Sequence, residues 1–308
     1  MQSLRNNTTG SDNTAIGHQS LTSNTTGLKN IALGGAAMQT NTTGDFNTAV
    51  GREALQKNTT ADNNVAVGYQ ALEENTTGAN NTAVGINSLG SNTTGDNNTV
   101  VGALAGDALT TASYNVVLGY EALTADTKGA NNVAIGSFAL RDQNFTSATN
   151  AYNVAIGYEA GGSVTTGNEN TLIGGLTGDA LTVGFANVAI GTGALGADTQ
   201  GSRSVAVGKS ALANQNFTSA TNAYNVAVAE LAGLSITTGV QNTLIGSLSG
   251  DAITEAGFNA AVGMFSLSQN TLGSKNTALG YAALSAFNVT SAADTYNTAV
   301  GSGAGAAL

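Results

Sequence analysis

A short pattern of apolar and polar residues recurs along the whole chain. A copy reads Asn, any residue, a small or aliphatic residue, an aliphatic residue and Gly, as in NTAIG at 13–17 and NTAVG at 47–51; the two exceptions are Ser204 at the Asn position and Ala229 at the Gly position. We number the Asn as position 0. Position 2 is usually Ala, and position 3 is always Val, Ile or Leu. The β-branched residues and the lack of a helical period predict a short strand over positions 1 to 3.

The pattern occurs seventeen times, and its spacing is regular. Position 0 falls at Asn13, Asn30, Asn47, Asn64, Asn81, Asn98, Asn115, Asn132, Asn153, Asn170, Asn187, Ser204, Asn225, Asn242, Asn259, Asn276 and Asn297. The spacing is 17 residues, except for 21-residue steps that begin at Asn132, Ser204 and Asn276. The long steps carry the related inserts QNFTSATNAY at 143–152 and 215–224 and FNVTSAADTY at 287–296. Both chain ends fall inside a repeat, so we expect a fragment of a longer array.

The second half of each repeat has its own pattern. Position 7 is Ala, Ser or Thr, position 8 is Leu, Met or Gly, and NTTG or a relative follows before the next Asn. Charged residues avoid positions 1, 2, 3, 7 and 8. Each repeat therefore predicts two short strands, at positions 1–3 and 7–8, divided by turns. We expect the Gly at position 4 and the Gly of NTTG to adopt positive φ.

A 17-residue unit cannot bury an apolar face alone, whereas stacked copies can. We therefore predict an all-β fold over residues 1–308, a single continuous parallel β-solenoid, or β-roll, with matching residues about 4.8 Å apart. The aliphatic residue at position 3 is expected to form the inner column, and Asn at position 0 an amide ladder. The Ala residues at positions 2 and 7 are expected to face outward, where a neighbouring chain can approach. A homotrimer follows from this arrangement, and a lone solenoid is the alternative.

Composition and charge exclude several classes of protein. The chain has 41 Gly and no Pro, Cys or Trp, so a disulfide framework and a thiolate metal site are ruled out. The formal net charge of −10 argues against nucleic acid or an anionic membrane as a partner. No apolar run is long enough to cross a bilayer, so we expect no membrane insertion in this segment.

No residue cluster in the sequence predicts catalysis, a cofactor or a metal. The single histidine, His18, has no ligand or dyad partner at a suitable spacing and is expected to be a solvated turn residue. Asp107, Asp179 and Asp251 each follow a Gly, but one carboxylate per repeat does not make a calcium site. The Asn-x-Ser/Thr sequons recur at turn positions, which favours turn chemistry over glycosylation. We expect the protein not to be an enzyme.

The aromatic residues of the inserts are the candidates for surface binding. They are Phe145, Tyr152, Phe217, Tyr224, Phe287 and Tyr296. On protruding inserts these rings could stack on sugars at a regular axial interval; alternatively, the inserts fold back and the rings cover the thin core. The threonines of NTTG could also form a regular row of hydroxyl groups of the ice-binding kind.

The repeat resembles two families of fibrous proteins. NTAVG, NVAIG and NVAVG, followed by Ala or Ser and then Leu, resemble the N-x-V-A-I-G repeats in the heads of trimeric autotransporter adhesins. With NTTG between copies, the pattern also resembles the shaft repeats of bacteriophage tail fibres and related bacterial surface fibres. The resemblance covers residues 3–305 and implies left-handed parallel β-rolls packed three to a fibre. The longer period and the recurrent four-residue insert depart from the adhesin pattern.

The resemblance implies a structural or adhesive fibre segment, extracellular, at a cell surface or on a virion. Such a segment projects a binding tip or provides multivalent attachment to a host glycan or receptor. A self-assembling extracellular filament and a passive spacer without binding activity are the alternatives. The repeat alone leaves a phage and a bacterial origin both open.

Overall fold

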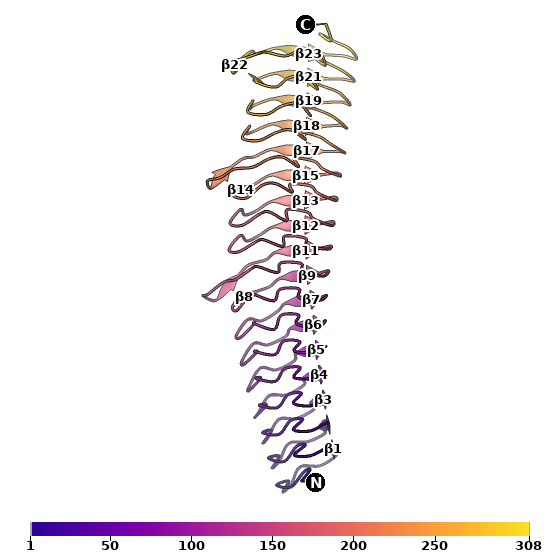
Figure 1. Ribbon diagram of the computed structural model, residues 1–308, viewed down its shortest axis with the longest axis vertical. Coiled ribbons are helices and arrows are strands. Elements are labelled where there is room, and N and C mark those ends of the chain that lie inside the picture. The colour runs from indigo at the N-terminus through magenta and orange to yellow at the C-terminus, as the bar shows by residue number, and fades with distance from the viewer. Residues whose placement is uncertain (1, 308) are drawn as a thin grey trace. The chain divides into compact units, whose positions relative to one another are not determined.

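In a computed structural model that describes residues 2–307, the chain is a parallel β-solenoid of about seventeen coils, with no helix among those residues. A coil runs from one position 0 to the next and is named here by its position-0 residue. The chain divides into a first unit that ends at Tyr152 and a second that begins at Asn153. Within each unit the coils follow one another along one direction (Figure 1). The predicted all-β solenoid is confirmed.

Positions 1 to 3 form the three-residue strand of each coil. In the first unit these strands are β1 (Thr14–Ile16), β2 (Ile31–Leu33), β3 (Thr48–Val50), β4 (Val65–Val67), β5 (Thr82–Val84), β6 (Thr99–Val101), β7 (Val116–Leu118) and β9 (Val133–Ile135). In the second unit they are β11 (Val154–Ile156), β12 (Thr171–Ile173), β13 (Val188–Ile190), β15 (Val205–Val207), β17 (Val226–Val228), β18 (Thr243–Ile245), β19 (Ala260–Val262), β21 (Thr277–Leu279) and β23 (Thr298–Val300).

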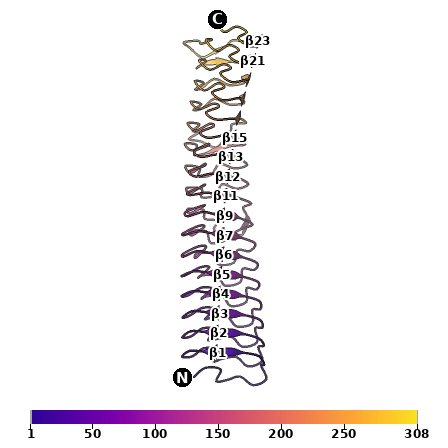
Figure 2. The ribbon, with the colours of Figure 1, turned by 90° about the vertical axis from the view of Figure 1, so that its right-hand side faces the viewer.

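The strands stack in parallel and in register, as the 17-residue period predicts. Val50 is the partner of Val67, and Val67 is the partner of Val84. Figure 2 shows β1 to β7 of the first unit stacked in one column. Identical positions therefore lie in files along each unit, and the chemistry of a face is set by which positions point to it.

Each long coil adds a two-stranded parallel ladder. Its insert pairs with the coil before it through β8 (Gly129–Ala130) with β10 (Thr149–Asn150), β14 (Gly201–Ser202) with β16 (Thr221–Asn222), and β20 (Gly273–Ser274) with β22 (Ala293–Asp294). In Figure 1 the inserts extend beyond the outline of the neighbouring coils. The inserts are thus tied to the stack by backbone hydrogen bonds rather than hanging free.

The prediction of a second strand at positions 7–8 is wrong. Positions −1, 6 and 8 have left-handed backbone in every coil, as in the Asn30 coil at Lys29 (φ 55°), Ala36 (φ 58°) and Met38 (φ 49°). The N–H of Ala36 donates to His18 in the coil before, whereas the N–H of Met38 donates to Ala54 in the coil after. Left-handed residues interrupt an extended strand. These turns nevertheless give each coil backbone hydrogen bonds to both neighbours.

The two recurrent glycine positions of the repeat serve different purposes. The Gly at position 4 has the predicted positive φ, for example 137° at Gly85. The Gly of NTTG does not, and the expectation of positive φ there is wrong. It is required for space, because a Cβ on Gly44 would lie 2.4 Å from the carbonyl oxygen of Ala61 in the next coil. Close stacking, and not backbone freedom, selects that glycine.

The structure reverses the predicted inside and outside of the strand. Position 2 is buried in nearly every coil, as at Ala66, while position 3 faces outward, as at Val67 with 36% of its surface exposed. Position 7, also predicted to face outward, is buried, as at Ala71, and so is position 8, as at Leu72. The interior is narrow, because three turn positions per coil fold the chain tightly. The small Ala at position 2 and the Leu at position 8 together fill this space.

A paired exchange keeps the core filled where position 8 is Gly. Position 11 is then aliphatic instead of Asn, Asp, Gln or Phe, and these aliphatic residues are fully buried: Leu109, Val164, Leu181, Ile236 and Ile253. A Cβ placed on Gly106 would lie 3.1 Å from Cδ1 of Leu109. The side chain from position 11 thus occupies the space of the missing side chain at position 8.

Two ladders of asparagines run along the coils. At position 0, Oδ1 of Asn47 accepts the backbone N–H of Asn64 (2.9 Å), and Nδ2 of Asn47 donates to the carbonyl of Ala61 (2.8 Å). At position 11, Nδ2 of Asn41 donates to Oδ1 of Asn24 (2.8 Å). The predicted amide ladder is therefore present, mainly through side chain to backbone bonds, and a second one accompanies it. Both ladders satisfy buried polar groups of the turns.

Candidate functional site

The six candidate aromatic residues divide into two groups. The phenylalanine rings are buried: Phe145, Phe217 and Phe287 are 7%, 5% and 8% exposed. The tyrosines are exposed: Tyr152, Tyr224 and Tyr296 keep 54%, 46% and 66% of their surface. The rings of Phe145 and Phe287 pack against the glycines of the preceding coil, Gly129 and Gly273. The phenylalanines therefore cover the core and are closed to a ligand, whereas the tyrosines are accessible.

A buried aspartate anchors each of the first two inserts. Oδ1 of Asp198 accepts the backbone N–H groups of Gly201 (2.9 Å) and Phe217 (3.1 Å), and Oδ2 accepts Nε2 of Gln215 (2.6 Å). Asp126 holds the first insert through Phe145 and Gln143 in the same way. Neither aspartate was singled out from the sequence. The feature of the sequence that could have identified them is their place at position 11 of the coil that precedes a long coil.

Cations stand beside the exposed tyrosines of the second unit. The guanidinium of Arg203 donates to the Tyr224 hydroxyl (2.8 Å) and lies 5.2 Å from the centre of the Phe185 ring. Lys275 donates to the Tyr296 hydroxyl (3.1 Å) and pairs with Asp294 (2.7 Å). The same cations lie 5.8 Å from the centre of the Tyr224 ring and 5.1 Å from the centre of the Tyr296 ring, which adds cation–π attraction.

The exposed large apolar side chains gather at a few positions of the repeat. Among residues 2–307 all of them except Leu176 and Val183 occupy positions −1, 1, 3 or 5. Examples in the first unit are Ile16 (65% exposed), Leu118 (47%) and Tyr120 (47%). We call the outward-facing residues at positions 1 and 3 the apolar face; positions −1 and 5 flank it. Soluble monomers seldom expose a continuous apolar surface of this kind.

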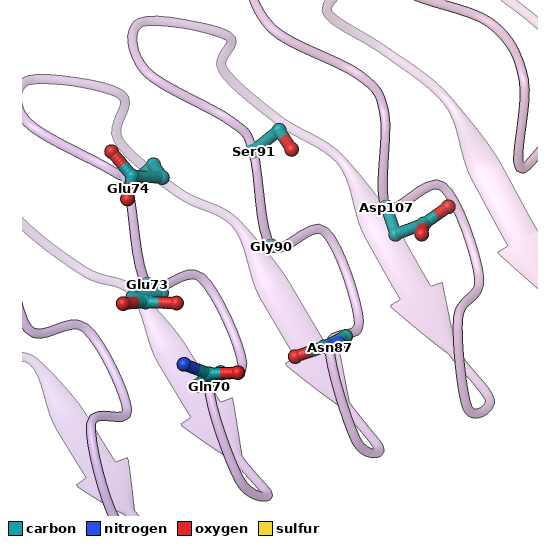
Figure 3. Close-up of a pocket in the computed structure, with 7 residues that line it drawn as sticks. All are labelled: Gln70, Glu73, Glu74, Asn87, Gly90, Ser91 and Asp107. Carbon is teal, nitrogen blue, oxygen red and sulfur yellow. The ribbon is translucent and has the colours of Figure 1, made fainter.

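An acidic hollow of about 230 Å³ opens across three coils of the first unit (Figure 3). Its lining residues are Gln70, Glu73, Glu74, Asn87, Gly90, Ser91 and Asp107. Glu73, Gly90 and Asp107 occupy the same position in three consecutive coils. Because Gly90 has no side chain, the space between the two carboxylates is left open. Glu74 is already paired with Lys57 (2.6 Å). Within residues 2–307 no three His, Cys, Asp or Glu side chains meet in a metal-binding group.

Several carboxyl groups are harder to ionise in the folded chain than in water. Burial raises the pKa of Asp198, Asp107, Asp179 and Asp251, and burial together with Glu74 raises the pKa of Glu73. The Lys275 ammonium lowers the pKa of the exposed Asp294 carboxyl. In the buried groups desolvation outweighs the hydrogen bonds that favour the charged form.

These shifts predict a protein that is stabilised by mild acid. A carboxyl whose folded pKa is raised binds more protons in the folded state, so the free energy of unfolding rises as the pH falls through that pKa. We expect the midpoint of thermal unfolding to rise between pH 7 and about pH 4, near the ordinary pKa of Asp. Circular dichroism during heating at a series of pH values measures it, and Asp179→Asn should flatten the rise. A midpoint that falls steadily from pH 7 would contradict the assignment.

The remaining candidates have local roles. His18 is exposed at position 5, at a turn. The sequon residues Asn24, Asn41 and Asn58 are fully buried in the position-11 ladder, so their side chains cannot carry a glycan in this fold. The exposed hydroxyls of NTTG are those of the second threonine, as at Thr26 and Thr43. The first threonine donates to the next coil instead, as Thr25 does to Thr42 (3.0 Å).

No family model matches the chain, and no curated protein matches it either. Likeness to adhesins and tail fibres therefore rests on the repeat. Among residues 2–307 there is no helix with the length and apolarity to cross a bilayer.

Proposed function

We propose that this chain is a segment of a homotrimeric attachment fibre, of the kind found in phage tail fibres or bacterial surface adhesins. One observation carries the proposal: each unit displays a continuous apolar face on an otherwise polar solenoid. Obligate interfaces between chains are apolar and depleted of charge. Charged residues are absent from positions 1 and 3 in every coil. Three copies packed through this face would bury it around a common axis.

The chains in this proposal do not meet through the alanines at positions 2 and 7, as the sequence had led us to expect. Ala at positions 2 and 7 fills the interior of each coil, so the chains meet through Val, Ile, Leu and Thr at positions 1 and 3. Positions −1 and 5 lie at the rim, where Tyr69 and Tyr158 stay partly in water. The rim and the inserts are then available for multivalent, individually weak contacts with a glycan or receptor on a host surface.

The oligomeric state tests the proposal. Light scattering after size exclusion should give three times the 30.4 kDa mass of one chain. Replacing Val50, Val67 and Val84 by Lys should yield a soluble monomer, because three outward charges per chain cannot be buried together. Circular dichroism should still report folded strands, since these side chains lie outside the core.

A matched control adds the same charge elsewhere in the first unit. Thr43, Thr60 and Thr77 are exposed in consecutive coils, on positions away from the apolar face. Their replacement by Lys should leave the trimer intact. A wild-type chain that is monomeric at micromolar concentration, or a trimer that survives the valine replacements, would refute the trimeric arrangement.

A further inference from the structure

A groove of about 350 Å³ lies beside the first insert, within the first unit. Three neighbouring segments line it: 111–114 of the Asn98 coil, Lys128 and Ala130 of the Asn115 coil, and 148–150 of the Asn132 coil. The ladder between β8 and β10 sets these segments side by side, with Asn150 in register with Ala130. The groove is therefore a product of the insert, and none of its lining residues is at position 1 or 3.

The side chains around the groove combine an aromatic surface with polar groups. Tyr114 is 61% exposed, and its backbone N–H donates to the carbonyl of Asp96 in the preceding coil (3.1 Å). Asn150 is exposed and is held in place by Nδ2 of Asn131, which donates to Oδ1 of Asn150 (2.9 Å). Asn150 and Thr111 are both exposed and both line the groove. An aromatic ring with nearby amide and hydroxyl groups matches the two faces of a sugar ring, one apolar and one polar.

The charge in the groove is positive. Lys128 is the one charged residue that lines it, on a chain whose formal net charge is −10. Of the ion pairs between described residues, none involves Lys128. Lys128 is half-buried and lines the groove. An unpaired ammonium beside a ring-stacking surface selects for a ligand with a carboxylate.

We propose that this groove binds an acidic sugar residue of a polysaccharide. The apolar face of the sugar stacks on Tyr114, its carboxylate pairs with Lys128, and its hydroxyl groups bond with Asn150 and Thr111. Tyr114 and Asn150 are two coils apart, roughly 10 Å at the strand spacing, which is room for one sugar ring. The proposal rests on the attachment function proposed above and names the ligand class.

The repeat supplies its own comparison for this site. The residues 72 positions further on are Ala186 in place of Tyr114 and Gln200 in place of Lys128, beside a second insert of identical sequence. The second site therefore retains Asn222 and differs in its ring and cation, with Phe185 in place of Ser113 and Arg203 in place of Asn131. Tyr114→Ala and Lys128→Gln introduce the residues that the chain itself carries at these two positions 72 residues further on, at exposed or half-buried positions that leave the core unchanged.

Saturation-transfer NMR and calorimetry on the full chain test the proposal, with glucuronate-containing oligosaccharides and neutral glucose oligosaccharides of equal length as probes. The wild-type chain should bind the acidic probe at least tenfold more tightly than the neutral one. Tyr114→Ala should reduce affinity for both probes at least tenfold. Lys128→Gln should abolish the preference and leave the weak neutral binding. Tyr152→Ala, an exposed tyrosine that does not line the groove, should change nothing.

Other outcomes would overturn the site. No binding of the acidic probe, equal affinity for both probes, or identical losses in Tyr114→Ala and Tyr152→Ala would each reject it. The mass measurement separates this failure from failure of the fibre proposal, because the trimer forms through positions 1 and 3 whether or not the groove binds. If the trimer attaches to cells and the Tyr114→Ala variant attaches equally well, the fibre proposal stands and the groove proposal is rejected.

Discussion

Exchanging Gly106 for Leu and Leu109 for Asn in the same chain is expected to leave the protein nearly as stable as the wild type, although each change alone is damaging. Leu109→Asn alone removes a fully buried side chain and should cost about 3–5 kcal/mol of the free energy of unfolding. Gly106→Leu alone overfills the site that Leu109 occupies and should cost about 1–3 kcal/mol. Together they recreate the Leu and Asn found at positions 8 and 11 of the Asn47, Asn64 and Asn81 coils.

The neighbouring coils make the rescue specific. Leu89 and Leu123 are the position-8 residues on either side and are fully buried. The new Leu would join their file, and the new Asn would lie between Asn92 and Asp126 in the polar file of position 11. The backbone at position 8 already suits a leucine, since φ is 53° at Gly106 and also 53° at Leu89. Chemical denaturation of the four chains gives the coupling energy, expected to exceed about 2 kcal/mol. Additive losses would show that the two positions do not share one space.

A Cβ at position 4 is the second change with a large expected effect. Gly85 has φ 137°, and a Cβ there would lie 2.4 Å from the carbonyl oxygen of Gly102 in the next coil. Gly85→Ala must strain its own backbone and push the two coils apart, at a cost of about 3–5 kcal/mol. The loss should be visible as a lower midpoint of urea unfolding.

The chain contains the reverse case. Ala229 occupies position 4 with φ 112°, a value that side chains rarely adopt. Ala229→Gly should therefore stabilise the protein, by about 1 kcal/mol after the entropy cost of glycine. If Gly85→Ala is harmless, or if Ala229→Gly destabilises the chain, then position 4 is not the point of closest approach between coils.

The period of the sequence was enough to predict the stack and its register. Steps of 17 residues place Val50, Val67 and Val84 in one file, and the structure pairs them residue for residue. The 21-residue steps correctly located the inserts. The period determines the register because, in a parallel stack, only a shift of one whole repeat brings identical turns into contact.

The direction of the side chains could not be obtained in the same way. A strand of three residues offers two faces, and the larger residue at position 3 was assigned to the core on the assumption of a solenoid that buries its own aliphatic residues. The interior admits only Ala66 and its equivalents at position 2, because left-handed turns at positions such as Gln70 and Leu72 draw the coil tight. Those turns involve residues with no strong preference for left-handed backbone, so the sequence gives little sign of them.

The candidate site was predicted only in part. Aromatic residues at a regular spacing identified the inserts, but side-chain direction again decided the outcome: Phe145 is covered, and Tyr152 is exposed. The groove at Tyr114 depends on how 111–114 and 148–150 lie across the β8–β10 ladder. The two segments are at least 34 residues apart in sequence. The 17-residue pattern predicts that they are neighbours but does not show that their side chains leave a hollow between them.

The central claim is that each 17-residue window advances the first unit by one strand spacing. Pulsed electron spin resonance tests it most directly, because the chain has no cysteine and spin labels attach only where one is introduced. Pairs at Thr26 and Thr94 and at Thr9 and Thr111 place labels four and six coils apart on an exposed file, with labelled chains diluted in unlabelled ones. The mean distances should be about 19 Å and 29 Å, in steps of about 4.8 Å per coil. Distances that do not grow with the number of coils would contradict the stack itself.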